Sequence, residues 1–242
     1  MKKLTTLLVM LLFTAGMAFG QNNATVDQND DGNEAFIDQV GDLNTANVEQ
    51  TSDVGLSEGE GHFADIDQLG LGGLGSGVNN LATVKQDFRV TGAHATTIEQ
   101  WGDDNVAHVE QVDAGNNVAN ILQDGIENFA NVYQQYWNEF DATQIGDDNK
   151  IIGVPGGGTY GFGGRAFQIA DGFSSLRYEM DFTQDGDNNT IQAGQERGYG
   201  SSTILQTGDW NAALSYQNGG SGDMIDIAQT GHENDAVVNQ IN

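Results

Sequence analysis

The sequence predicts an all-β protein, a parallel two-sheet β-solenoid in which the chain coils through two facing sheets. Glutamine recurs at a spacing of 10 to 12 residues in eleven of fifteen intervals along the chain. Asparagine, alanine and Val or Ile often precede these glutamines by six, four and two residues, which is the side-chain period of a strand. The 242 residues include 34 glycines but a single proline, which suits a chain of hydrogen-bonded strands and tight turns.

The first element is a predicted secretory signal peptide over residues 1–20. Two lysines precede an apolar run at residues 7–13, which is too short to span a bilayer as a membrane anchor would. Ala18 and Gly20 occupy the −3 and −1 positions of a small-x-small cleavage site. We therefore expect the mature chain to begin at Gln21, and no later stretch is apolar enough for membrane insertion.

The chain is strongly acidic and contains no cysteine. Removal of the leader takes away two lysines and no acid, so the formal charge changes from −27 to −29. Phosphate backbones would repel such a surface, which argues against nucleic acid as a partner. Without disulfides, an exported chain depends on packing and hydrogen bonding alone.

Sixteen glutamines and eleven asparagines mark the repeat, which occupies a first block at residues 21–152 and a last block at residues 178–242. Side chains spaced by two residues along a strand share one face, so all of these amides are expected to point inward. The glutamines predicted to form the amide ladder are Gln28, Gln39, Gln50, Gln68, Gln86, Gln100, Gln111, Gln123, Gln134, Gln144, Gln184, Gln195, Gln206, Gln217, Gln229 and Gln240. The asparagines predicted to form it are Asn22, Asn33, Asn44, Asn80, Asn105, Asn117, Asn128, Asn138, Asn189, Asn211 and Asn234.

Two strands and two turns are needed to close one turn of such a coil, because one 11-residue unit cannot close on itself. One rung then takes about 22 residues, and sixteen strands make about eight rungs at a rise of ~4.8 Å each. Stacking places glutamine over glutamine and asparagine over asparagine. An amide carries both donors and an acceptor, so like side chains can bond along a column.

Glycine-rich segments interrupt the repeat at residues 51–61, 69–79 and 153–165. The last contains Pro155 and begins a predicted insertion over residues 153–177, within which Gln168 marks a degenerate strand. We expect these segments to be loops ejected from the coil, or a hinge between two stacks of rungs.

The spacing Gln-x4-Asn-x5-Gln resembles the curlin repeat of curli fibre subunits. It occurs at residues 28–39, 39–50, 100–111, 123–134, 206–217 and 229–240. The inner pattern Gly-x-x-Asn-x-Ala occurs at residues 41–46, 102–107, 125–130 and 208–213. The resemblance covers about three-quarters of the mature chain.

This resemblance implies a secreted structural subunit of an extracellular functional amyloid fibre. Curli subunits cross the outer membrane of Gram-negative bacteria through a dedicated pore, fold onto a nucleator and add to fibre ends. The fibres support biofilm matrix and adhesion. The implied partners are further copies of this chain, a nucleator and the secretion pore. The long interruptions depart from the compact family pattern, so the roles of major subunit and minor or nucleator subunit both stay open.

Motifs that would indicate catalysis or a cofactor fit turns better. Two Gly-x-Gly-x-x-Gly runs, at residues 70–75 and 156–161, lack the strand–helix setting of a nucleotide-binding loop. The run at residues 27–38 starts like a calcium loop but ends in Asp where a bidentate Glu is expected. The histidines are scattered, and the first two replace a turn asparagine: His62, His94, His108 and His232. We expect no enzymatic activity, no cofactor and no metal.

Two features leave alternatives open. Acidic turns such as residues 102–105 and 146–149 fit either solvated turns or weak calcium sites. The outward residue before the glutamine changes from acidic, as at Asp38, to apolar, as at Leu205, which fits an ordinary sheet surface or a lateral docking face. A monomeric β-solenoid adhesin, with or without calcium, is the alternative to a fibre subunit.

Overall fold

The computed structural model describes residues 21–29, 32–52, 61–69, 79–88, 92–113, 115–154, 165–169, 177–219 and 221–241. The predicted signal peptide and most of the glycine-rich interruptions lie outside these residues. The described residues contain no helix, and so none that is long and apolar enough to cross a membrane.

The predicted all-β parallel solenoid is confirmed: eighteen described strands form two parallel sheets. Sheet A contains β1 (Asn23–Asn29), β3 (Thr45–Ser52), β5 (Leu81–Phe88), β7 (Val106–Val112), β9 (Phe129–Gln135), β11 (Lys150–Gly153), β12 (Ala166–Ile169), β14 (Thr190–Glu196), β16 (Ala212–Asn218) and β18 (Asp235–Ile241). Sheet B contains β2 (Glu34–Val40), β4 (Phe63–Leu69), β6 (Ala95–Asp103), β8 (Val118–Ile126), β10 (Asn138–Ile145), β13 (Tyr178–Asp185), β15 (Tyr199–Thr207) and β17 (Ser221–Thr230).

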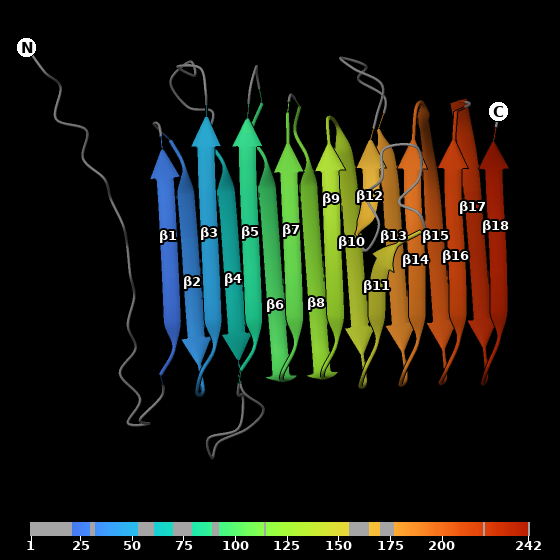
Figure 1. Cartoon of the computed structure of the whole chain (residues 1–242), viewed down its shortest axis with the longest axis horizontal. Helices are drawn as coiled ribbons and strands as arrows, with labels where there is room; N and C mark the ends of the chain where they lie inside the picture. Colours follow the sequence, from blue (N-terminus) through green and yellow to red (C-terminus); the bar gives the residue numbers. More distant parts are fainter. Residues whose placement is uncertain are drawn as a thin grey trace, which may run out of the picture.

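The chain alternates between the two sheets, so strands next to each other in sequence lie in different layers. Figure 1 shows the strands following one another along the long axis, from β1 at one end to β18 at the other. Most strands pair in parallel with the strand two positions away, as β1 does with β3 and β2 does with β4, whereas β10 pairs with β13. The register places identical repeat positions side by side, for example Gln28 beside Gln50.

The core between the sheets is thin and made of small or β-branched side chains. Inward and outward residues alternate along each strand, and in β4 the inward residues are Ala64, Ile66 and Gln68, all fully buried. The alanine column leaves room for the sheets to approach closely, and the Val/Ile column fills the space beside it. Toward the C-terminal half, Phe140 and Phe182 replace smaller residues and pack edge to face with ring centroids 5.7 Å apart.

β11 and β12 together occupy one strand position, between β9 and β14. β11 pairs with the first halves of these neighbours, and β12 pairs with their second halves, where Gln168 aligns with Gln134 and Gln195. The predicted insertion at 153–177 therefore includes a short strand that keeps the register of the coil. With this shared position, the described coil has seventeen strand positions, half a rung more than the predicted sixteen strands.

Seven of the eight turns from sheet B to sheet A share one backbone conformation over the described residues. A glycine with positive φ stands three residues before an asparagine, and the residue just before that asparagine is left-handed, as in Gly208 (φ 99°), Trp210 (φ 59°) and Asn211. A Cβ on Gly208 would lie 2.3 Å from the carbonyl oxygen of Gly231 in the next turn. Glycine is therefore required here both for its backbone angle and because the next turn stacks directly on it.

This stacking predicts different costs for the same substitution in adjacent turns. Gly208→Ala should destabilise the fold by about 3 kcal/mol or more, because strain adds to an overlap with backbone that cannot move aside. Gly231→Ala is the matched control: its φ is 113°, but the nearest atom to its Cβ is Asn234 Nδ2 at 3.6 Å. It should cost only about 1 kcal/mol. Chemical unfolding followed by circular dichroism measures both, and equal costs would contradict the steric account.

Candidate functional site

Glutamine side chains form one continuous column inside each sheet. In sheet B, each Nε2 donates to the Oε1 of the next glutamine at 2.8 to 3.0 Å, from Gln39 to Gln229. In sheet A, the same bond is 2.7 to 2.9 Å from Gln28 to Gln168, and 3.3 Å between Gln168 and Gln195. All donors point toward the C-terminal end of the coil, so each column has a fixed polarity.

The second hydrogen of each interior Nε2 binds across the core. Gln50 Nε2 donates to the carbonyl of Glu34 at 3.1 Å, and Gln123 Nε2 donates to the carbonyl of Val106 at 3.1 Å. Both acceptors belong to the preceding strand, which lies in the other sheet. Each interior glutamine thus joins the next rung through one donor and the opposite sheet through the other, and its buried polar atoms are satisfied.

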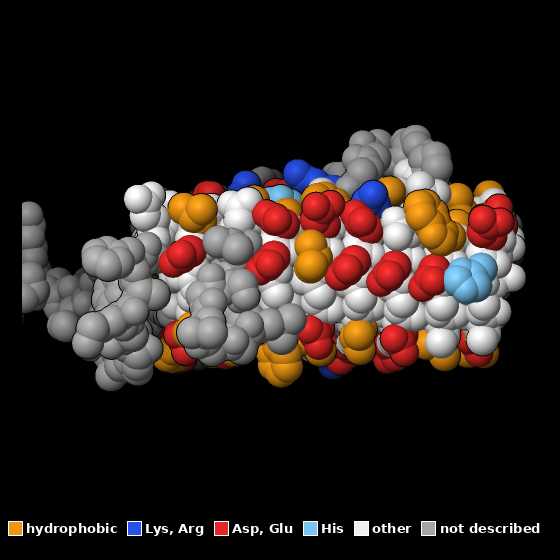
Figure 2. Space-filling view, turned by 90° about the horizontal axis from the view of Figure 1, so that it is seen from below, with side chains coloured by type: hydrophobic (Ala, Val, Ile, Leu, Met, Phe, Trp, Pro, Cys, Tyr) orange, Lys and Arg blue, Asp and Glu red, His pale blue; other side chains and the backbone are white. Residues whose placement is uncertain are grey.

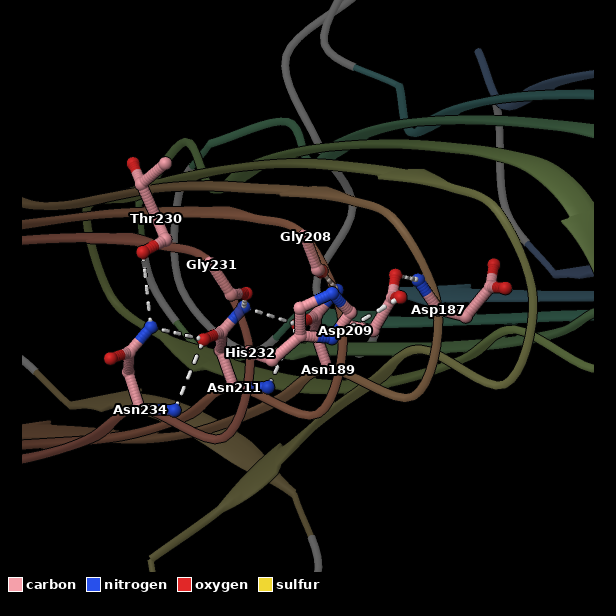
Figure 3. A network of polar contacts seen from close by, with 9 residues as sticks. All are labelled: Asp187, Asn189, Gly208, Asp209, Asn211, Thr230, Gly231, His232 and Asn234. Carbon is pink, nitrogen blue, oxygen red and sulfur yellow. Dashed lines mark hydrogen bonds and ion pairs between the residues drawn. The ribbon is translucent and has the colours of Figure 1, made fainter.

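Asparagine side chains form the second kind of column, at the turns that lead into sheet A. Each Oδ1 accepts from the backbone N–H of the next asparagine at 2.9 to 3.2 Å, from Asn22 to Asn234. The Nδ2 groups bind glycine carbonyls one turn further on, as Asn189 does to Gly208 at 2.7 Å. Figure 3 shows this arrangement over the last three turns, at Asn189, Asn211 and Asn234.

Histidines occupy two positions of the asparagine column that leads into sheet B. His62 N–H donates to Asn33 Oδ1 at 3.0 Å, and His94 N–H donates to His62 Nδ1 at 3.2 Å. Asn117 N–H in turn lies 3.4 Å from His94 Nδ1, and the two imidazole rings stack with centroids 5.1 Å apart. An Nδ1 that accepts a hydrogen bond carries no proton, so both rings are neutral in this arrangement.

All sixteen predicted glutamines lie in the two glutamine columns, and all eleven predicted asparagines lie in the two asparagine columns. The ladder prediction omitted four residues that the structure places in the columns: Gln168, Asn149, His62 and His94. Asn149 was missed because no glutamine follows it at the repeat spacing, since its strand position is divided between β11 and β12. The Gly-x-x-Asn spacing at Gly146 would have identified it.

Acidic side chains form outward columns of their own. Asp38, Asp67 and Glu99 occupy successive aligned positions on sheet B, and Figure 2 shows rows of Asp and Glu side chains along the turn face. Partial burial, then the charges of Asp65, Asp38 and Glu99, raises the pKa of Asp67. In the turns, Asp187 and Asp209 instead accept from backbone N–H groups of the preceding turn, at Asp147 and Asp187.

The described residues contain no group of three or more His, Cys, Asp or Glu side chains placed to hold a metal ion. The part of the predicted calcium-like run at residues 27–38 that the structure describes lies on β1, on β2 and in the turn before β2. The chemistry available in the columns is therefore hydrogen bonding, directed along the long axis.

Replacing one interior ladder glutamine by leucine should destabilise the coil by about 2 to 4 kcal/mol, because buried partners on three sides lose their bonds. Gln123 is suitable, since it contacts Gln100, Gln144 and the carbonyl of Val106. Gln192→Leu is the control, because Gln192 faces outward beside Leu214. The free energy of unfolding should be nearly unchanged in that variant. Similar losses of unfolding free energy in both variants would show that a glutamine in the column stabilises the fold no more than an outward glutamine does.

The histidine pair predicts a destabilisation in acid. Burial lowers the pKa of His62, and burial followed by the neighbouring His62 lowers the pKa of His94 to about 3. The unfolded chain therefore binds protons below about pH 6.5 that the folded chain does not bind, so His94 costs stability as the pH falls from 6.5 toward 3. The raised pKa values of Asp65 and Asp67 have the opposite sign.

His94→Asn separates the effect of the histidine from that of the aspartates, since asparagine restores the usual acceptor without a titrating ring. Between pH 7.5 and 4.5, wild type should lose about 2 kcal/mol more than the variant. Unfolding curves at the two pH values measure the difference. Parallel losses in the two proteins would assign the acid sensitivity elsewhere.

Comparison with known proteins agrees with the repeat. A family model described as the curlin associated repeat matches residues 21–51, which cover β1, β2 and most of β3. No curated protein and no solved structure matches the chain. The matched segment carries the first members of the glutamine and asparagine columns, and the same columns continue through the later rungs. Residues 21–51 are thus similar to the curlin associated repeat, and they are the segment in which the amide columns begin.

Proposed function

We propose that the chain is a secreted structural subunit of an extracellular, curli-like amyloid fibre that grows by end-to-end stacking of copies. One observation supports this above the others: the two glutamine columns run without interruption from the first strands to the last and are open at both ends. At one end the columns begin with the Oε1 atoms of Gln28 and Gln39. At the other end Gln240 Nε2 has no further glutamine in the described chain to bind.

The end strands are free to pair. β1 and β2 have no strand neighbour on their outer side, and neither do β17 and β18, among the described residues. Natural sheets usually guard such edges with charges, bulges or covering segments. Here the inward residues at the ends, such as Val26 and Val238, are only partly buried and belong to columns that a further rung would extend.

The amide ladder serves as the assembly element in this proposal. The proposed partners are copies of the same chain, together with a nucleator and an outer-membrane secretion pore by analogy with the family. The proposed organisation keeps residues 1–20 as the signal peptide, followed by repeat blocks at 21–152 and 178–242 around the segment at 153–177. The proposed location is the cell surface of a Gram-negative bacterium, where the fibre supports biofilm matrix and adhesion.

Purified chain covering residues 21–242 should form fibres that bind amyloid dyes and give a meridional reflection near ~4.8 Å. Val238→Lys, which places a charge on the inward side of the last strand, should slow seeded growth by about tenfold or more, because the next rung would bury that charge. Elongation is measured by dye fluorescence after seeding with preformed fibres.

Asn239→Lys is the matched control, since Asn239 lies on the same strand with its side chain exposed on the outward face. It should elongate close to the wild-type rate, and both variants should retain the β-sheet circular dichroism of the wild type. Wild-type chain that stays monomeric for days would reject the proposed function and favour a monomeric adhesin. Equal growth of the two lysine variants would reject addition at the β18 edge.

A further inference from the structure

The described part of the coil has an odd number of strand positions. Sheet A has nine positions, because β11 and β12 share one, and sheet B has eight. Among the described residues, the coil therefore begins in sheet A with β1 and also ends in sheet A with β18. The open position after β18 belongs to sheet B, directly beyond β17, so a following copy must supply a sheet B strand first.

On the basis of the proposed fibre, we infer that successive copies are rotated by about half a turn around the fibre axis, so that sheet A of one copy continues as sheet B of the next. A half-turn around this axis exchanges the two faces and reverses the strand direction, so β1 of the new copy lies on β17 and runs parallel to it. β2 of the new copy then lies on β18. The subunit repeat is eight and a half rungs, or about 41 Å at ~4.8 Å per rung.

Stacking without rotation would leave a defect at every junction. β1 of the new copy would lie on β18, and its β2 would stand two strand spacings, about 9.6 Å, beyond β17. The edge of β17 would stay unpaired, and a strand-wide gap would open the apolar core of sheet B to water. Buried backbone groups and apolar columns both disfavour such a gap.

The hydrogen bonds of the end glutamines continue in the rotated arrangement. Gln229 Nε2, which has no glutamine above it, turns to the carbonyl of Asn234 at 2.9 Å. In the rotated stack it meets Gln28 Oε1 of the next copy instead. Ladder glutamines also donate across the core to the carbonyl five residues before the glutamine of the preceding strand, as Gln240 does to Met224. For Gln28 the equivalent carbonyl is that of Asp235 on β18 of the preceding copy. This carbonyl lies across the core from Gln28 only when that β18 and the new β1 are in opposite sheets.

Exposed apolar side chains give an independent indication. Aligning the ladder glutamines of β2 and β18 places Phe36 beside Val237 and Val40 beside Ile241. In the single chain Phe36 is 44% exposed and Val237 is 66% exposed. Val40 is 49% exposed and Ile241 is 70% exposed. Stacking without rotation would instead place Thr25 and Asn29 of β1 beside Val237 and Ile241, leaving Phe36 and Val40 without apolar neighbours from the preceding copy.

The rotated junction brings one pair of like charges together, at Glu34 and Asp235. The chain already contains such neighbours within one column, since Asp38, Asp67 and Glu99 occupy successive positions. On the other strand pair, Asp27 lies beside Ala228 and Thr25 lies beside Asp226, so no like charges meet there. The junction is thus no more acidic than the interior of sheet B.

Cysteine pairs introduced at outward, exposed positions distinguish the two arrangements, because the chain has no cysteine of its own. Asp27→Cys with Ala228→Cys should cross-link neighbouring subunits in oxidised fibres, since the rotated stack brings these residues into register on adjacent strands. Asp27→Cys with Asn239→Cys should not, because these residues then lie on opposite faces. Within one chain each pair is separated by about 36 Å or more, so oxidation yields intermolecular bonds only. The single-cysteine variants serve as controls.

The expected result is a ladder of covalent oligomers for D27C/A228C and monomers for D27C/N239C on denaturing gels. The opposite pattern, or cross-linking of neither pair in well-formed fibres, overturns the rotation while the proposed fibre function stands. Absence of fibres from the wild-type chain rejects both. Helical reconstruction of wild-type fibres gives a second measurement, in which a repeat near 41 Å with a rotation near 180° beyond the solenoid twist is expected.

Discussion

The buried side-chain amide is the group on which the rest of this structure depends. Each interior glutamine has two donor hydrogens and one acceptor oxygen to satisfy, and the coil uses one donor along the column and the other across the core. The same side chain therefore holds successive rungs together and holds the two sheets together. Because a buried amide without partners is costly, every rung requires its neighbour to supply the matching glutamine at the matching height.

This requirement accounts for the regularity of the strands and the irregularity of the loops. A change in strand length or register would move a glutamine out of its column, so the strand-to-strand alignment is maintained even where β11 and β12 divide one position. The turns into sheet A repeat a Gly-x-x-Asn unit because the asparagine binds the next turn. At His62 and His94 an imidazole nitrogen takes over the role of the asparagine oxygen, at the cost of sensitivity to acid.

The same bonding makes the ends of the coil directional. A column in which every Nε2 points one way presents an acceptor at its first rung and a donor at its last rung. Two first rungs, or two last rungs, therefore do not complement each other. Strong negative charge on the outer faces opposes lateral contact between monomers at long range, whereas at the ends short-range hydrogen bonding and apolar burial can exceed it. Assembly along the axis and solubility of the single chain are thus compatible in one sequence.

The sequence by itself determined the strand period, the inward face and nearly all members of the amide columns, because side-chain alternation and the repeat of Asn, Ala, Val/Ile and Gln are local properties. The ladder role of His62 and His94 became clear only when hydrogen-bond partners 23 or more residues away were placed. Tertiary structure alone also decided that β11 and β12 share one position, and hence that the coil begins and ends in the same sheet. The odd number of strand positions depends on which strands pair across a long interruption of the repeat. No local pattern of residues predicts that pairing.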